Sequence, residues 1–162
     1  MERRHNYQMT KELIVLAHNI RSTYNVGSFY RTADGAGVSK IILSGYTARP
    51  PHPGIAKVAL GAETWLPWEY VKVPGPWLRR MQRTGYHIAA LEQSPQSINI
   101  FKFKPRWPLI LIVGNEVRGV SKGLQKYAKT VLVIPMVGKK ESLNVASAMA
   151  IAVYSLLESR SR

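Results

Sequence analysis

The stretch ESLNVASAMAIAVYSLLE, residues 141–158, places sixteen uncharged residues between two glutamates. It predicts a helix over 144–158 without a charged face. A helix that is apolar all round is covered on more than one side, although the whole chain carries a formal net charge of +14. Its small residues would let neighbouring segments come close, and they are Ala146, Ala148, Ala150 and Ala152. The rest of the fold must therefore supply the surfaces that bury this helix.

Five short apolar runs predict buried β-strands in the rest of the chain. They are continuous rather than alternating, which is typical of parallel strands covered on both faces. The runs span residues 13–17, 40–45, 86–92, 109–114 and 130–136. Helices are expected at 25–36, 76–84, 121–128 and 144–158. This pattern predicts an α/β fold of three layers around a parallel sheet.

The length and composition indicate one compact domain over residues 1–162, with a short N-terminal extension over 1–12. No apolar run follows the basic residues at the start of the chain, so no signal peptide is predicted. The uncharged stretch before Glu158 is shorter than a membrane span. We therefore expect a cytoplasmic protein that has no membrane partner.

The charge is strongly positive, with 23 lysines and arginines against nine acidic residues. Such an excess favours a polyanion, because each neutralised phosphate releases counterions. Nucleic acid is favoured over an anionic membrane surface, since no basic amphipathic helix is present to lie on the membrane. The candidate RNA-binding residues are Arg21, Arg49, Arg79, Arg80, Lys139 and Lys140.

Aromatic and basic residues also surround a proline-rich surface loop at 48–54. They are Tyr46, Arg49, Trp65, Trp68, Trp77, Arg79 and Arg80. Two interpretations are open for this set. The aromatic residues are ordinary members of the core and its rim, or they form a surface on which unstacked bases lie.

Several kinds of chemistry are disfavoured by the residues that the chain lacks. There is no cysteine, so a thiolate nucleophile and a zinc–thiolate site are both excluded. Asp34 is the only aspartate, the glutamates are scattered and the four histidines show no ligand spacing, so no metal site is expected. Residues 114–121 have the glycine spacing of a P-loop, but Val120 stands where its lysine is required.

Three stretches share one pattern, in which a strand ends and a polar or glycine-rich turn opens a helix. They are HNIRSTYNVGSFYRTADGAG (18–37), IVGNEVRGVS (112–121) and VIPMVGKKESLNVASA (133–148). In open α/β sheets, ligands bind at such carboxyl ends of strands. In this order the three stretches resemble the motifs of the SPOUT superfamily of RNA methyltransferases, specifically its SpoU/TrmH branch of ribose 2'-O-methyltransferases. The resemblance extends over about residues 13–157.

This resemblance implies an α/β fold with a C-terminal trefoil knot, S-adenosyl-L-methionine as methyl donor, and a homodimer. The family pattern points to Arg31, six residues after the motif residue Asn25, as the catalytic arginine. It also places Asn25, Glu116, Ser142 and Asn144 among the catalytic residues. Adenine is flat and neutral, so apolar walls suit it. The cofactor-binding candidates are Leu91, Gly114, Ile134, Met136, Leu143 and Asn144.

The sequence leaves the roles of several of these residues, and of the last helix, open. Arg31 could accept the proton of the ribose hydroxyl, or it could stay charged and anchor an RNA phosphate. Glu116 could act at the site or hold a turn by accepting backbone N–H bonds. Ser142 and Asn144 are suited to cap the last helix. That helix could meet a twin subunit, or it could be the central core helix of a monomer.

The function that the resemblance implies is methylation of a ribose 2'-hydroxyl in tRNA or rRNA. Short single-domain relatives often modify tRNA, which favours tRNA. One alternative is a non-catalytic RNA-binding protein of the same fold, and another is a SPOUT enzyme that methylates a base. The sequence does not identify the RNA, the nucleotide or any partner protein.

Overall fold

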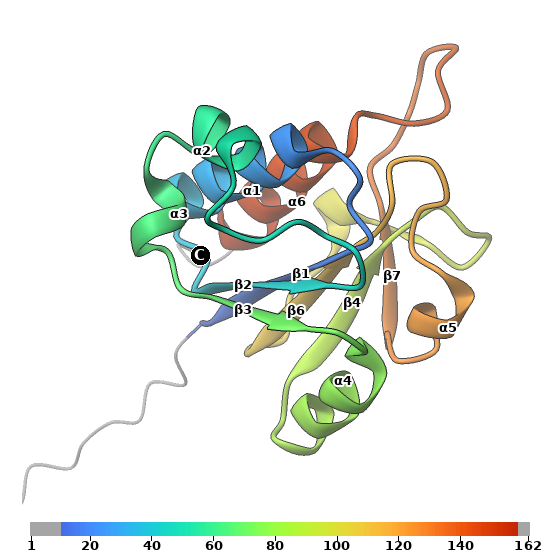
Figure 1. The fold of residues 1–162 in the computed structure, drawn as a ribbon. Helices are drawn as coiled ribbons and strands as arrows, with labels where there is room; N and C mark the ends of the chain where they lie inside the picture. Colours follow the sequence, from blue (N-terminus) through green and yellow to red (C-terminus); the bar gives the residue numbers. More distant parts are fainter. Residues whose placement is uncertain (1–10, 159–162) are drawn as a thin grey trace, which may run out of the picture.

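The computed structural model describes residues 11–158, and these form a sheet of seven parallel strands between two layers of helices (Figure 1). The strand order is β3-β2-β1-β6-β4-β7-β5. The strands are β1 (Leu13–His18), β2 (Lys40–Ser44), β3 (Trp68–Val71), β4 (His87–Leu91), β5 (Ile98–Asn99), β6 (Leu109–Val113) and β7 (Thr130–Val133). Most of the predicted N-terminal extension lies outside the described residues.

The helices confirm the three-layer arrangement. One face of the sheet carries α1 (Thr23–Ala36), α2 (Pro53–Ala59), α3 (Ala62–Trp65) and α6 (Val145–Glu158). The other face carries α4 (Pro74–Arg83) and α5 (Lys122–Gln125). A short 3-10 turn, η1 (Ile100–Lys102), follows β5. Among the described helices, none has both the length and the apolar character needed to cross a lipid bilayer.

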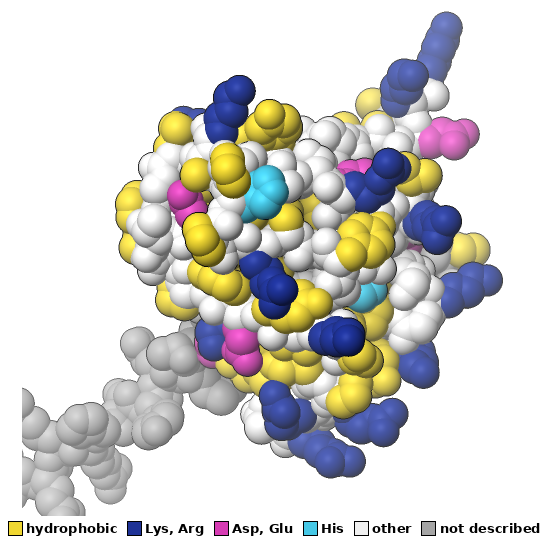
Figure 2. All heavy atoms as spheres, viewed as in Figure 1, with side chains coloured by type: hydrophobic (Ala, Val, Ile, Leu, Met, Phe, Trp, Pro, Cys, Tyr) yellow, Lys and Arg dark blue, Asp and Glu magenta, His cyan; other side chains and the backbone are white. Residues whose placement is uncertain are grey.

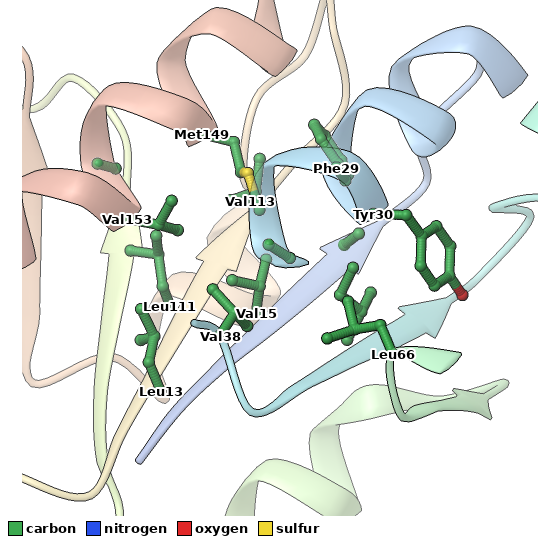
Figure 3. Close-up of a cluster of buried hydrophobic side chains, with 14 of the residues drawn as sticks. Leu13, Val15, Phe29, Tyr30, Val38, Leu66, Leu111, Val113, Met149 and Val153 are labelled. Atoms are coloured by element: carbon green, nitrogen blue, oxygen red, sulfur yellow. The ribbon is translucent and has the colours of Figure 1, made fainter. Parts of the chain in front are cut away.

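Alternate side chains of the central strands β1, β2, β4 and β6 enter two separate hydrophobic cores. In β1, Val15 faces the core beneath α1 and α6, whereas Leu16 faces the core beneath α4. Figure 3 shows Met149 and Val153 of α6 directed toward the strands from the first side. Because both faces of every central strand are covered, these strands have no exposed polar side, which explains their continuous apolar sequences.

Helix α1 is fixed at both ends by local interactions. Ser22 has an extended backbone and its hydroxyl accepts a hydrogen bond from the N–H of Asn25 at 3.2 Å, as an N-cap residue does. Gly37 ends the helix with φ of 80°, a left-handed conformation that glycine adopts without strain. Between these ends, a Cβ on Gly27 would lie 2.5 Å from the carbonyl oxygen of Ile55, so glycine allows α1 to pack closely on α2.

Helix α6 is capped by Asn144, whose Oδ1 accepts hydrogen bonds from the N–H groups of Ala146 at 2.9 Å and Ser147 at 3.3 Å. The predicted cap by Asn144 is therefore confirmed, but a cap by Ser142 is wrong. Within residues 11–158, the side chain of Ser142 makes no hydrogen bond to the helix and instead lines a pocket. One side of α6 is buried on the sheet and α1. The other side leaves Ile151 36% exposed and Tyr154 53% exposed.

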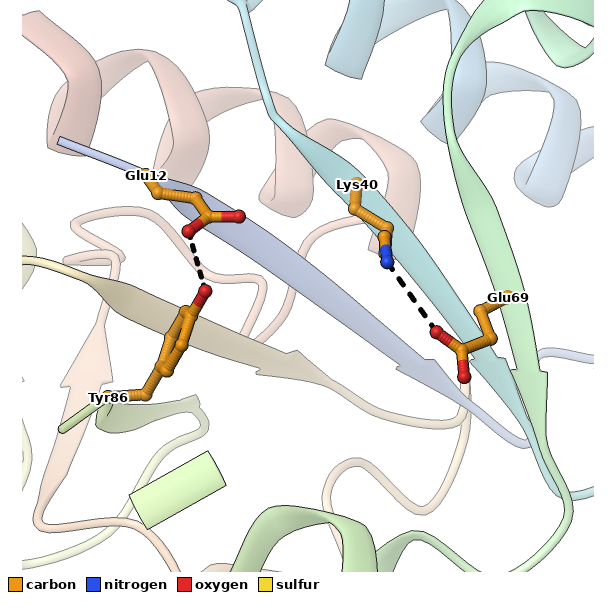
Figure 4. Close-up of polar contacts among 4 residues, drawn as sticks. All are labelled: Glu12, Lys40, Glu69 and Tyr86. Carbon is orange, nitrogen blue, oxygen red and sulfur yellow. Dashed lines mark hydrogen bonds and ion pairs between the residues drawn. The ribbon is translucent and has the colours of Figure 1, made fainter. Parts of the chain in front are cut away.

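Polar contacts join neighbouring segments at the amino ends of the strands (Figure 4). The hydroxyl of Tyr86 donates to Glu12 at 2.5 Å. Burial, together with the hydrogen bond and the charge of Glu12, raises the pKa of Tyr86 to about 12. Lys40 pairs with Glu69 at 3.5 Å, and both side chains are exposed, so this pair contributes little to stability. The contact between Tyr86 and Glu12 thus joins two segments at the amino ends of the strands. The loops that contain the predicted site residues lie at the opposite, carboxyl ends.

Some elements differ from the sequence-based prediction. The predicted strands correspond to β1, β2, β4, β6 and β7, but β3 and β5 at the two sheet edges were missed. Helix α2 was missed because it begins at Pro53, within the predicted loop. Proline is suited to the first position of a helix, and the ring of His52 caps the helix by accepting a hydrogen bond from the N–H of Gly54. Only residues 122–125 of the predicted helix over 121–128 are α-helical.

Candidate active site

A pocket lies at the carboxyl ends of β4, β6 and β7, between the loop that follows β6 and the loop that precedes α6. Five of the six residues predicted to bind the cofactor line it, and so do two of the predicted catalytic residues. These seven are Leu91, Gly114, Glu116, Ile134, Met136, Ser142 and Leu143. The sixth cofactor candidate, Asn144, lies next to the pocket and caps α6. The predicted roles of these side chains stay predictions.

The loop after β6 owes its shape to its own backbone. Asn115 and Gly119 exchange two N–H···O hydrogen bonds, of 3.0 and 2.9 Å. The Oδ1 of Asn115 also accepts from the N–H groups of Val117 and Arg118 at 2.9 Å each. A Cβ on Gly114 would lie 2.2 Å from the carbonyl oxygen of Gly119. The returning loop therefore approaches Gly114 closely, and the contact of Gly114 with a cofactor stays a prediction.

Glu92 also lines this pocket and was not predicted. Its Oε2 accepts a hydrogen bond from the N–H of Val120 at 2.8 Å, which ties the end of β4 to the loop after β6. Gly119 has φ of 66°, and a Cβ there would lie 1.9 Å from the same carboxylate oxygen. A charged residue directly after a buried strand was the available signal for Glu92.

Glu116 binds the segment that opens α1. Its two carboxylate oxygens accept hydrogen bonds from the N–H of Arg21 at 3.0 Å and the N–H of Ser22 at 2.9 Å. The side-chain amide of Asn25 donates a third bond at 3.1 Å. Glu116 thus holds backbone N–H groups, as one of its two predicted roles requires, but the groups belong to another loop.

These bonds determine the ionisation of Glu116. Its burial alone would raise the pKa of the carboxyl group. The hydrogen bonds from Arg21, Ser22 and Asn25, with its own backbone N–H, outweigh the burial and hold the pKa below its ordinary value. The ionised carboxylate is therefore the form that the site stabilises.

The side chain of Asn115 connects three loops. Its amide donates to the carbonyl oxygen of Asn19 at 2.9 Å and to the hydroxyl of Tyr46 at 2.8 Å. Asn19 follows β1 and Tyr46 follows β2, so the ends of β1, β2 and β6 are joined at this one residue. Asn115 lines the pocket as well, and its role in joining the loops was not predicted.

Arg31 is not part of the pocket in the single chain. It lies exposed on α1, six residues after Asn25, which corresponds to about 9 Å along a helix axis. The structure therefore brings Asn25 and Glu116 into contact but leaves Arg31 apart from Ser142 and the cofactor candidates. Within residues 11–158, no three His, Asp or Glu side chains gather as metal ligands would.

The candidate RNA-binding residues lie on several separate elements, and Figure 2 shows positive side chains dispersed over one face of the molecule. Arg21 lies beside Glu116, and Lys139 and Lys140 lie on the exposed loop before α6. Arg79 and Arg80 lie on α4, on the opposite face of the sheet from α1 and α6.

The predicted aromatic and basic surface is dispersed in the same way. Trp77 of α4 is buried in the second core, and Trp68 packs against the first core. Trp65 is exposed on α3, where its ring N–H donates to Asp34 at 2.8 Å. For the tryptophans at 68 and 77, the interpretation as core and rim residues is therefore correct.

The second and third motif stretches line the pocket at the carboxyl ends of the parallel strands, and Glu116 bonds the first stretch to it. This arrangement in an α/β sheet defines a methyltransferase domain of the SPOUT class. The chain belongs to the SpoU rRNA Methylase family, whose family model matches residues 12–154. This membership implies the trefoil knot that was expected from the sequence.

Characterised relatives include enzymes that modify two kinds of RNA. The tRNA (guanosine(18)-2'-O)-methyltransferase of Aquifex aeolicus is 34% identical over 151 residues, which cover 93% of this chain and 71% of that enzyme. The 23S rRNA (guanosine-2'-O-)-methyltransferase RlmB of Ralstonia nicotianae is 29% identical, over 92% of this chain and 59% of the relative.

A solved structure extends the comparison to three dimensions. The SpoU methyltransferase AviRb from Streptomyces viridochromogenes, in complex with the cofactor AdoMet, superposes with a TM-score of 0.84 at 28% identity. The match covers 93% of this chain and 58% of AviRb. This chain thus spans less than two thirds of AviRb and of the Ralstonia enzyme.

The bonds to Glu116 predict a specific dependence of stability on pH. Glu116→Gln replaces an acceptor oxygen by an N–H₂ group that faces donors, so we expect the free energy of unfolding at pH 7 to fall by about 1–3 kcal/mol. The pKa of Glu116 is lower in the folded state than in the unfolded state. The contribution of its ionised form is therefore present above the unfolded pKa, near 4.5, and is lost as the pH falls through the folded pKa.

Urea denaturation of the native protein and of Glu116→Gln at several pH values measures this contribution. The difference between the two should be constant from pH 7 to about pH 5 and should narrow at lower pH. A difference that stays constant down to pH 3 would contradict the assigned role of the carboxylate.

Proposed function

We propose that the protein is an RNA methyltransferase that uses S-adenosyl-L-methionine to methylate a ribose 2'-hydroxyl in tRNA or rRNA. The observation that carries the proposal is the pocket, where residues from all the predicted cofactor segments converge in a member of the SpoU family. The Aquifex and Ralstonia relatives are named as 2'-O-methyltransferases of tRNA and 23S rRNA. The higher identity to the Aquifex enzyme favours tRNA.

The residues of the pocket suit this cofactor. Leu91, Ile134, Met136 and Leu143 supply the apolar walls that a flat adenine ring requires. Within residues 11–158, the backbone N–H groups of Met136 and Leu143 make no hydrogen bond to other protein groups, so they are available to the polar edge of a base. The bound cofactor supplies an activated methyl group, which requires no metal ion.

Residues on and around α1 would then handle the RNA. Glu116 accepts hydrogen bonds from the backbone of Arg21 and Ser22, and in this way it holds the start of α1 beside the pocket. A guanidinium group keeps its proton in proteins and pairs well with phosphate. We therefore assign Arg31 the role of holding an RNA phosphate near the ribose, where the phosphate can receive the hydroxyl proton.

A second copy of the chain is proposed as the partner that covers α6. The outward side of this helix keeps Ile151 and Tyr154 exposed and has no charge before Glu158. An uncharged helix face of this kind is a self-complementary surface for a two-fold dimer. The homodimer is also what the family resemblance implies.

The cofactor pocket predicts that Leu143→Arg abolishes binding of S-adenosyl-L-methionine. Leu143 lines the pocket, so an arginine there would place a longer, charged side chain in the space for the base. Val137→Arg is the matched control, because Val137 lies on the same loop but is fully exposed and outside the pocket. Isothermal calorimetry on both variants tests the proposal, and equal affinity for both would move the cofactor elsewhere.

The role assigned to Arg31 predicts a defect in methyl transfer itself. Arg31→Ala should lose about 100-fold or more in rate, the scale of a residue that assists proton transfer, while calorimetry shows unchanged cofactor binding. Arg31→Lys should recover part of the rate, since an anchor for phosphate depends mainly on charge. Arg106→Ala is the control, because Arg106 is exposed near the amino end of β6.

The assay follows transfer of a labelled methyl group to RNA from cells that lack the protein. The product should resist alkaline cleavage at the modified nucleotide, because methylation removes the 2'-hydroxyl that attacks the adjacent phosphate. Methyl transfer that yields an alkali-labile product would support a base methyltransferase. An absence of transfer despite cofactor and RNA binding would support the non-catalytic alternative.

The proposed dimer predicts that Ile151→Glu dissociates the protein by burying an unpaired charge at the interface. Ala148 is unsuitable for this test, because it lines the pocket. Val73→Glu is the control, since Val73 is an exposed apolar residue away from α6. Sedimentation at micromolar concentration should show a dimer for the native protein and Val73→Glu, and a monomer for Ile151→Glu. A monomeric native protein would refute the proposal.

A further inference from the structure

A second pocket lies at the carboxyl ends of β2 and β3, in the loop that leads to α2. It is separate from the pocket proposed for the cofactor, and none of its residues belongs to the three motif stretches. Its lining consists of Gly45, Tyr46, Thr47, Ala48, Arg49, Pro50, His52 and Tyr70. No acidic residue is among them.

The walls of this second pocket are held by buried hydrogen bonds. The hydroxyl of Thr47, which is buried, accepts from the N–H of Ile20 at 3.0 Å and donates to the carbonyl oxygen of Ala17 at 3.1 Å. The hydroxyl of Tyr70 donates to the carbonyl oxygen of Gly45 at 2.7 Å. The pocket is therefore formed in the free protein, so binding there would not first have to order the loop.

The side chains at its mouth combine a positive charge with flat rings. The guanidinium of Arg49 lies over the ring of Tyr70, 4.1 Å from its centroid. The ring of Tyr46 is 61% exposed, while its hydroxyl is held by Asn115. An exposed aromatic ring whose position is fixed is a stacking platform for a nucleobase, and an arginine beside it can bind phosphate or stack in turn.

The second pocket lies close to the pocket proposed for the cofactor, and one hydrogen bond joins a lining residue of each. Asn115 lines the cofactor pocket and donates to Tyr46, which lines the second pocket. In the sheet, β2 lies two places from β6, or about 10 Å at the usual strand spacing. A ligand in the second pocket would therefore lie alongside one in the first, at the same edge of the sheet.

We propose that this second pocket binds an unpaired nucleotide of the RNA beside the methylated ribose, with the base on Tyr46 and a phosphate at Arg49. The inference rests on the proposed function in taking RNA as the substrate. A base can reach an aromatic ring in this way only when it is unstacked, so the pocket selects single-stranded positions over duplex RNA.

Fluorescence of a short single-stranded RNA that carries one 2-aminopurine tests the proposal without cofactor or methyl transfer. Binding to the native protein should quench the fluorescence, because the base stacks on Tyr46. Tyr46→Ala should abolish the quenching and weaken affinity roughly 5- to 100-fold, the range for one lost base–aromatic stack. Tyr46→Phe keeps the ring and should keep the quenching. The matched control is Phe101→Ala, since Phe101 is also 61% exposed but lies by the opposite sheet edge, after β5.

A second pair of variants tests the phosphate contact proposed for Arg49. Arg49→Ala should weaken binding and reduce the slope of log affinity against log salt by about 0.7. Arg83→Ala on α4 removes an equally exposed charge and should leave the quenching unchanged. Quenching that persists in Tyr46→Ala, or that is equally lost in Phe101→Ala, would overturn the proposal.

Calorimetry of S-adenosyl-L-methionine with Tyr46→Ala separates this inference from the proposed function. Native cofactor affinity together with lost quenching supports the second pocket. A parallel loss of cofactor binding would show that Tyr46 only supports the loop of Asn115, and would overturn the inference. Failure of the native protein to bind cofactor would refute the proposed function instead, whatever the RNA result.

Discussion

The hydrogen bonds between the carboxylate of Glu116 and the N–H groups of Arg21 and Ser22 join segments 95 and 94 residues apart in the chain. They determine where α1 begins relative to the loop after β6. Since α1 packs on both α2 and α6, its position in turn sets the layer of helices on that face of the sheet. The geometry of the site therefore depends on one ionised side chain that accepts hydrogen bonds from Arg21, Ser22 and Asn25.

Two of the carboxylates around the pocket, Glu92 and Glu116, share this way of acting. Each accepts backbone N–H groups from a loop other than its own. Both carboxylates are thereby hydrogen-bonded within the protein, and most of the charged side chains on the face seen in Figure 2 are lysines and arginines. If the site binds a polyanion as proposed, a carboxylate repels it less when backbone N–H groups already donate hydrogen bonds to that carboxylate.

The central elements were predictable because their sequence carries a local signal. Strands β1, β4 and β6 are covered on both faces, and they are apolar apart from His18 and His87 at the strand ends. Most of the pocket residues lie at or just after the carboxyl ends of the strands. Edge strand β3 contains the exposed Glu69, and β5 has two residues, so neither gives a continuous apolar run. The partners of Glu116 and Asn115 could not be predicted, because their contacts span up to 96 residues and leave no local pattern.

The distribution of charge suggests how the molecule would separate attraction from selection. Arg79 and Arg80 lie on α4, whereas Lys139 lies on the loop before α6, which is on the far side of the sheet from α4 (Figure 1). These charges therefore cannot all contact the same nucleotide. Contacts to phosphate position a nucleic acid but carry no sequence information. The two pockets joined by Asn115 are, by contrast, concave and fixed by hydrogen bonds. Under the proposed function, we therefore expect discrimination among nucleotides at this edge of the sheet and a general affinity for RNA from the dispersed charges.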